Sequence, residues 1–137
     1  MIRVSAPASG GGGASAGTYD PTLSIVSPTP IATVAAAAPF SWTRVGDVVS
    51  VAGLVDVTPS SNRATNEVDV SLPVASGSPA SLAGVCTANS LPSTDALEMA
   101  GIIESSGANA RVRWTSAFNN APGPYTLAVR FSYVVTP

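Results

Sequence analysis

The ionisable side chains of this sequence are few, and their types limit the chemistry that they could perform. The chain contains eight Asp and Glu residues, six Lys and Arg residues, and no His. Carboxylates are therefore the only acid–base candidates, and a glycosidase would need two of them across one cleft. The sequence gives no reason to pair any, so we expect them in turns and on solvated strand faces. They are Asp20, Asp47, Asp56, Glu67, Asp69, Asp95, Glu98 and Glu104.

Nucleophiles and metal ligands are equally sparse. Cys86 is the single cysteine, and without an imidazole neither it nor any Ser has an evident base to accept its proton. A zinc site would have to combine Cys86 with carboxylates, which is an unusual ligand set. The run Gly10–Gly13 does not follow a strand and open a helix, as a phosphate-binding loop does. We expect no enzymatic activity, no cofactor and no metal, and a buried apolar position for Cys86.

Three aromatic residues offer the one candidate binding site of another kind. Trp42, Trp114 and Tyr19 could form a platform for a sugar, since aromatic faces bind sugars in lectins. The alternation of apolar and polar residues already places both tryptophans on faces that point to the core. We therefore expect core packing for Trp42 and Trp114.

The composition indicates which partners the chain could have. Only 10% of the residues are charged, 45% are hydrophobic, and the net charge is −2 with no Lys. Nucleic acid is an unsuitable partner because its phosphates require several cations. No segment approaches the roughly 20 apolar residues that cross a bilayer, and the amino terminus lacks a secretory stretch, so we expect a soluble chain. So sparse a set of charges suggests that partners cover part of the surface.

The elements that must position these side chains are organised around residues 40–57, FSWTRVGDVVSVAGLVDV. Two alternating runs flank Gly46 and Asp47, and a Gly at the first central position suits the type II′ turn of a hairpin, with type I′ as the alternative. With a two-residue loop, Phe40 faces Gly53, and we expect the aromatic ring to cover the missing side chain. The same register pairs Val45 with Val48, Arg44 with Val49, and Trp42 with Val51. The predicted dry face carries Phe40, Trp42, Val49, Val51, Val55 and Val57.

Alternation predicts strands through the rest of the chain as well. They cover residues 22–26, 31–34, 68–74, 82–88, 110–118 and 125–135, with loops at 58–66 and 119–124 and a candidate helical turn at 35–38. Asp95–Glu104 fits either a strand or a helix. Thr94 or Asp95 could cap a helix, but Gly101 weakens it, and we favour a strand. About eight or nine short strands predict an all-β fold, an antiparallel β-sandwich of the jelly-roll type.

The amino-terminal residues differ in character from the rest. Residues 1–18 are rich in Gly, Ala and Ser and have little apolar surface to bury, so we expect an extended arm, followed by a single domain over residues 19–137. Ile2 and Val4, with Arg3 between them, are the candidate partner-binding tip of this arm. A neighbouring subunit is the simplest partner that could hold it, because such segments become ordered on binding.

Three short segments carry a resemblance to known proteins. They are Gly17–Pro21 (GTYDP), Phe40–Gly53 (FSWTRVGDVVSVAG) and Phe131–Val135 (FSYVV). Their aromatic residues, the Arg-Val-Gly turn and the Val-Ser-Val-Ala-Gly strand resemble the jelly-roll domains of small virion proteins of tailed bacteriophages. The resemblance extends from Gly17 to the end of the chain.

The resemblance implies a non-enzymatic structural role on the surface of the phage particle, after synthesis in the host cytoplasm. In one interpretation the chain is a capsid decoration (cement) protein that binds the major capsid protein and copies of itself, as a dimer or trimer. In the other it is a fibre knob, similar to trimeric complement-like or tumour-necrosis-factor-like heads. A carbohydrate- or receptor-binding module is the alternative of a different class, and it predicts exposed aromatics or an Arg pocket on loops 58–66 or 119–124. The length, the start at Met1 and the Gly-rich arm favour decoration.

Overall fold

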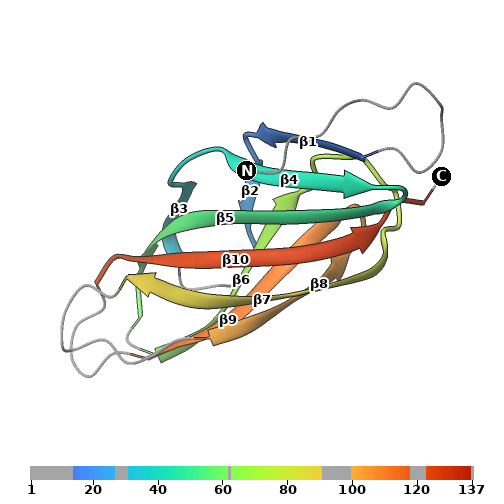
Figure 1. Cartoon of the computed structure of the whole chain (residues 1–137). Coiled ribbons are helices and arrows are strands. Elements are labelled where there is room, and N and C mark those ends of the chain that lie inside the picture. The colour runs from blue at the N-terminus through green and yellow to red at the C-terminus, as the bar shows by residue number, and fades with distance from the viewer. Residues whose placement is uncertain (1–13, 27–30, 62, 91–99, 118–122, 137) are drawn as a thin grey trace.

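The computed structural model describes residues 14–26, 31–61, 63–90, 100–117 and 123–136 (Figure 1). Within them the protein is all-β, and no described helix is long and apolar enough to cross a membrane. The strands are β1 (Ala14–Tyr19), β2 (Leu23–Ile25), β3 (Ile31–Ala36), β4 (Phe40–Val45), β5 (Val48–Pro59), β6 (Arg63–Ser71), β7 (Ala80–Ser90), β8 (Ala100–Ser106), β9 (Asn109–Ala117) and β10 (Tyr125–Val134).

All described strands belong to one antiparallel sheet that curls into a half-barrel. Its order is β1-β4-β5-β10-β7-β8-β9-β6-β2. The long strand β5 has β10 on one edge, and β4 and β3 share its other edge, with β4 along the first half and β3 along the second. In Figure 1, β4, β5, β10 and β7 face the viewer while β6 and β9 pass behind them. The prediction of an antiparallel all-β fold is confirmed.

The central hairpin has the predicted register. Trp42 pairs with Val51 and Val45 pairs with Val48 across a two-residue turn. Gly46 has a φ of 61°, and Ser81 is the one non-glycine residue with a positive φ in the described part of the chain. A positive φ at the first central position alone is the signature of a type II′ turn, which decides between the two predicted turn types.

Phe40 lies directly over Gly53, as predicted. A Cβ atom added to Gly53 would overlap the Cγ, Cδ1 and Cε1 atoms of the Phe40 ring. The ring is completely buried. A second aromatic residue covers a glycine in the neighbouring strand pair, because a Cβ on Gly17 of β1 would lie 3.2 Å from Nε1 of Trp42. Glycines thus allow the large rings of β4 to lie close to the backbone.

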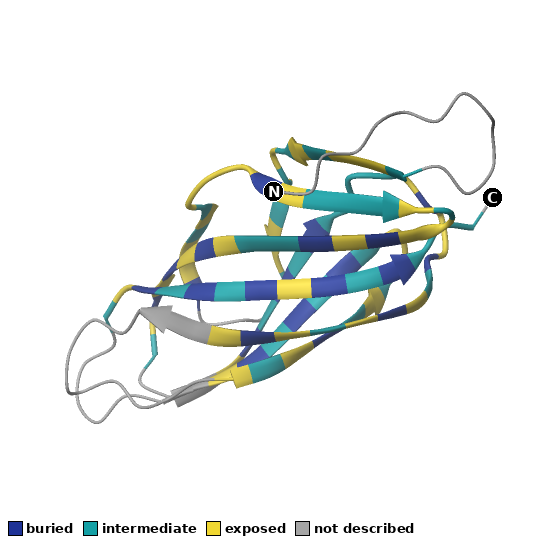
Figure 2. Cartoon of the chain, in the orientation of Figure 1, coloured by how far each residue is buried: buried dark blue, intermediate teal, exposed yellow. Residues whose placement is uncertain are grey.

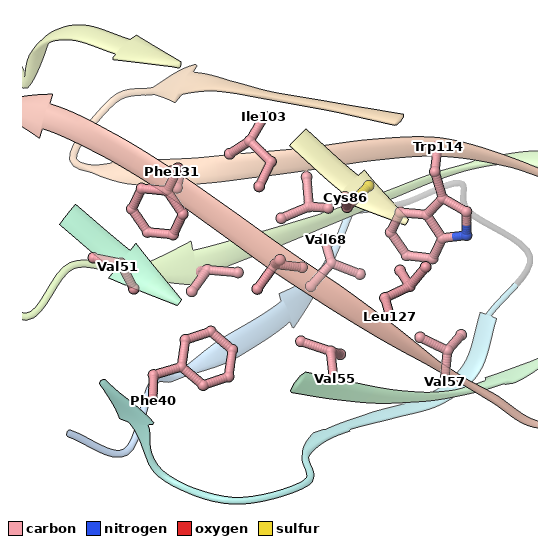
Figure 3. Close-up of a cluster of buried hydrophobic side chains, with 14 of the residues drawn as sticks. Phe40, Val51, Val55, Val57, Val68, Cys86, Ile103, Trp114, Leu127 and Phe131 are labelled. Carbon is pink, nitrogen blue, oxygen red and sulfur yellow. The ribbon is translucent and has the colours of Figure 1, made fainter. Parts of the chain in front are cut away.

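The core fills the concave side of the curled sheet. Alternate residues of β5 and β10 are buried, a pattern visible in Figure 2. Figure 3 shows side chains from several strands converging, including Phe40, Cys86, Trp114 and Phe131. The buried Trp114 donates its Nε1 hydrogen to the hydroxyl of Tyr125 at 2.7 Å. The dry face predicted for residues 40–57 is confirmed at Phe40, Val49, Val51, Val55 and Val57, and Trp42 packs half-buried against this core.

Several predicted boundaries were wrong, and pairing with distant strands explains them. Residues 58–66 were expected to form a loop, but β5 continues to Pro59, where it pairs with Ile31, and β6 begins at Arg63. Residues 35 and 36 belong to strand β3 instead of a helical turn, because Ala35 pairs with Asp56. Within Asp95–Glu104 the strand interpretation is confirmed from residue 100 onward by β8, and residues 95–99 lie outside the described residues.

Strand β1 begins inside the segment that was assigned to the arm. Residues 14–18 pair with β4, so that Ala14 lies opposite Val45 and Thr18 lies opposite Ser41. The hydroxyl of Tyr19 then donates to the carbonyl oxygen of Ser71 at 2.8 Å, which joins the end of β1 to the far side of the sheet. Residues 1–13 lie outside the described residues.

Candidate interaction surface

The convex side of the sheet carries apolar side chains where a sheet facing water would carry polar ones. Outward positions of neighbouring strands line up in rows, since Arg130 of β10 pairs with Ala52 of β5 and with Val85 of β7, and Val85 pairs with Ile102 of β8. Val85 is 59% exposed and Ile102 is 53% exposed. We name this surface the outer apolar face and define it as Ala52, Leu54, Val85, Ala100, Ile102 and Ala128. Arg130 lies between Ala52 and Val85 in one row, and Thr87 lies between Ala128 and Ala100 in the next.

The outer apolar face is hollowed over β5 and β10. An open depression of about 640 Å³ lies there. Small residues form its floor because Ala52, Gly53 and Ala128 leave the sheet backbone thinly covered. Leu54 and Val85 line it as well, together with the polar side chains of Ser41, Thr87 and Arg130. The depression is therefore a shallow apolar hollow that a protruding side chain of a partner could fill.

Arg130 is the charged residue of the outer apolar face. It is exposed, and no ion pair joins it to a described carboxylate. Its position between Ala52 and Val85 surrounds a fixed positive charge with apolar groups. A partner that covers the face must therefore supply an acceptor for the guanidinium, because a buried charge without a partner is costly.

A ladder of ion pairs borders the outer apolar face on β8, β9 and β6. Arg111 binds Asp69 through two hydrogen bonds, of 2.8 and 3.1 Å, and this hydrogen bonding raises the pKa of Arg111. Arg113 lies between two carboxylates, 3.0 Å from Glu67 and 2.7 Å from Glu104. Two arginines thus face three carboxylates, which leaves this border with one excess negative charge. The Arg113–Glu104 pair is exposed to water on both sides, and a pair of this kind contributes about 0–1 kcal/mol.

The residues that could act as nucleophiles or metal ligands do not come together in a catalytic or metal site. The thiol of Cys86 is 1% exposed, and burial raises its pKa to about 11, which keeps it protonated at neutral pH. Its predicted buried position is confirmed. Among the described residues no group of three or more His, Cys, Asp or Glu side chains could hold a metal ion.

The three aromatic residues do not form an exposed platform. Trp114 is 2% exposed and bonded to Tyr125, Trp42 is half-buried against Gly17, and the Tyr19 hydroxyl is bonded to a carbonyl of β6. Core packing is therefore confirmed for Trp114, and Trp42 is a partly buried side chain that packs against the core. The predicted partner-binding residues Ile2, Arg3 and Val4 lie outside the described residues.

Sequence reasoning missed the outer apolar face. Alternation predicts strands over residues 82–88 and within Asp95–Glu104, but it does not show that Val85 and Ile102 share one outward surface. The signal was present at Val85 and Ile102, which are apolar at outward positions beside the apolar inward residues Cys86 and Ile103. Comparison with known protein families, with curated protein sequences and with solved structures gives no match for this chain.

Proposed function

We propose that this protein is a non-enzymatic structural protein of a bacteriophage particle, a capsid decoration protein of jelly-roll type. In this proposal it binds the major capsid protein and copies of itself. The observation that carries the proposal is the outer apolar face, which places Val85 and Ile102 in water on a chain with few charges. A contiguous exposed apolar patch is typical of a surface that binds another protein.

The arrangement of the resembling segments supports the same proposal. Gly17 lies in β1, residues 40–53 form β4 and the first half of β5, and residues 131–134 lie in β10. These four strands are consecutive neighbours in the sheet, in the order β1-β4-β5-β10. The resemblance to phage virion proteins therefore rests on one structural unit, in which Phe131 pairs with Val51.

The mechanism in this proposal is thermodynamic. A subunit that binds only the assembled lattice stabilises that lattice by its binding free energy. Two weak contacts on one subunit strengthen each other when both engage, because the second contact forms at a high effective concentration. In the proposal these contacts are the amino-terminal residues, with Ile2, Arg3 and Val4 at the tip, and the body of the domain.

The position of β1 refines the experiment that tests this function. A truncation through residue 17 would remove most of β1, whereas a truncation of residues 1–13 leaves the pairing of Ala14 with Val45 intact. Purified heads of the phage that encodes the chain are mixed with the full chain or with the truncated chain and sedimented. We expect the full chain to saturate regular positions on the head and the truncated chain to bind at least about 10-fold more weakly.

The binding experiment needs one control and has two outcomes that would contradict the proposal. Circular dichroism and thermal unfolding establish that the truncated chain is folded. Equal occupancy of heads by both chains would exclude a role for residues 1–13. Absence of the chain from heads, with electron microscopy locating it on a fibre or tail tip, would replace the decoration role by the fibre-knob alternative.

A further inference from the structure

We propose that the hollow over β5 and β10 receives a segment of a partner protein in which a carboxylate side chain stands next to an apolar one. Arg130 binds the carboxylate, and the apolar part of the hollow accommodates the neighbouring side chain. This contact rests on the proposed function, in which another protein covers the outer apolar face, and it adds the chemistry of the segment that docks there.

Arg130 has a guanidinium that no carboxylate of the described residues neutralises. The ion pairs of the other described arginines have N–O distances of 2.7–3.6 Å, and none of these pairs includes Arg130. Asp56 of the neighbouring strand accepts a hydrogen bond from Thr126 and lies four residues from Ala52, roughly 13 Å along β5. The planar fork of Arg130 is therefore free to bind both oxygens of a carboxylate from outside.

The Arg130 side chain lies between two depressions of the sheet surface. Beside the hollow there is a smaller depression of about 210 Å³ over β4 and β5. Its described lining residues belong to these two strands except for Arg130 of β10, so the Arg130 side chain reaches across β5. Ala52 leaves room for this, because it is small and pairs directly with Arg130. Arg130 consequently lines both depressions.

The two depressions differ in chemistry. The smaller one carries hydroxyl groups at the outward positions Ser41, Thr43 and Ser50, and Thr43 pairs with Ser50. Hydroxyl groups can donate hydrogen bonds to a carboxylate. The hollow on the other side of Arg130 is lined by aliphatic side chains that include Leu54 and Val85. A carboxylate on Arg130 thus has polar donors on one side and apolar surface on the other.

The charge and the shape of the site restrict the ligand. A phosphate group carries up to two negative charges. A single guanidinium on a chain of net charge −2 suits a carboxylate better, because the carboxylate has one charge. Sites for small molecules usually bury most of the ligand, whereas this hollow is open and shallow. A side chain presented by a larger partner needs less depth, since the surrounding interface excludes water from the contact.

Peptide titration tests the hollow without any phage component. The probe is N-acetyl-Leu-Glu-Leu-amide, added to the isotope-labelled full chain and followed by NMR. We expect the amide signals of Ala52, Val85 and Arg130 to shift, with weak binding in the millimolar range because an exposed ion pair contributes little. The matched peptide with Gln in place of Glu has the same shape without the charge, and it should bind about 10-fold more weakly.

Substitutions of arginine test the role of the guanidinium. Arg130→Gln should weaken the Glu peptide about 10-fold and remove the preference for Glu over Gln. Arg130→Lys keeps the charge but loses the planar fork, so it should weaken the Glu peptide about 3-fold. Arg44→Gln is the matched control, because it removes the same charge at the hairpin turn, and it should change binding less than about 2-fold.

Apolar substitutions test the hollow itself. Val85→Ser should weaken both peptides about 5-fold, whereas Val45→Ser at the hairpin tip should change them less than about 2-fold. The two valines are similarly exposed, at 59% and 62%. Ala128→Leu fills the floor of the hollow while it leaves Arg130 in place, and it should weaken both peptides about 10-fold by steric exclusion. Circular dichroism checks the fold of every variant.

Three results would overturn this contact: equal binding of the Glu and Gln peptides, a preference for Glu that persists in Arg130→Gln, or peptide binding that tolerates Ala128→Leu. Hexanoate, a small carboxylate with an apolar tail, is the second probe. If it binds as tightly as the Glu peptide, the ligand is a small amphiphilic carboxylate and the protein segment is excluded.

Occupancy of phage heads is measured separately. Full occupancy of heads by a chain that does not bind the Glu peptide would overturn this contact alone. Binding of the Glu peptide by a chain that ignores heads would overturn the decoration role alone.

Discussion

The contact between Phe40 and Gly53 gives a prediction whose magnitude follows from the structure. Gly53→Ala adds a methyl group that overlaps three atoms of the completely buried Phe40 ring. Overpacking of a core typically costs about 1–3 kcal/mol. The substitution also restricts the unfolded chain, which returns about 0.4–1 kcal/mol. We expect the free energy of unfolding to fall by about 1–2 kcal/mol.

A double-mutant cycle isolates the contact from other effects. Phe40→Leu shortens the side chain over Gly53 and, through lost buried surface, should cost about 1–2 kcal/mol on its own. In the Phe40→Leu background the added methyl group finds space, so Gly53→Ala should cost little or stabilise the protein. The coupling free energy should therefore be about 1–2 kcal/mol, with the double variant more stable than the sum of the single variants predicts.

Urea unfolding followed by tryptophan fluorescence and by circular dichroism measures these free energies. Gly77→Ala is the matched control because nothing lies within 4 Å of the added atom, and its effect should stay within about 0.5 kcal/mol. Additivity of the two substitutions within about 0.5 kcal/mol would falsify the stacking of Phe40 on Gly53.

Three further predictions follow from the buried side chains. The Cys86 thiol should resist alkylation at pH 7.5 in the folded chain and react fully in urea, because it is 1% exposed with a pKa raised to about 11; rapid native labelling would contradict this. Burial also raises the pKa of Tyr125 to about 12, so between about pH 9 and 12 the folded chain holds more protons than the unfolded chain. The stability that these protonated groups contribute should therefore be fully present below pH 8. The free energy of unfolding should fall as the pH rises, by up to about 1.4 kcal/mol per unit of pKa difference. Cys86→Ala should reduce the loss between pH 9 and 11. Trp114→Phe removes the donor to Tyr125 and should cost about 1–3 kcal/mol in urea unfolding, with Trp114→Phe and Tyr125→Phe together costing less than their sum.

The alternation of apolar and polar residues correctly predicted the strands in which one face is apolar and the other is polar. The hairpin at residues 40–57 is an example, because Gly46 defines the turn and the turn fixes the register. Strand β10 is another, since its alternation is nearly complete. In both cases the information lies within a few residues of the element that it specifies.

Long-range pairing accounts for what the sequence did not predict. Thr58 and Thr65 are polar and looked like loop residues, yet Thr58 pairs with Thr33 and Thr65 pairs with Thr115. The partner strand, more than side-chain preference, decides whether such residues are extended. The outer apolar face was missed for the same reason, because Val85 and Ile102 become one surface only when β7 lies beside β8.

The central place of β10 bears on how the chain folds during synthesis. Strands β5 and β7 each hydrogen-bond to β10 and not to each other. Until residues 125–134 have left the ribosome, each of them presents an unpaired edge that could template aggregation. The shared partner joins the two halves of the sheet, so we expect the nascent chain to remain vulnerable until β10 has emerged and then to fold in one cooperative step.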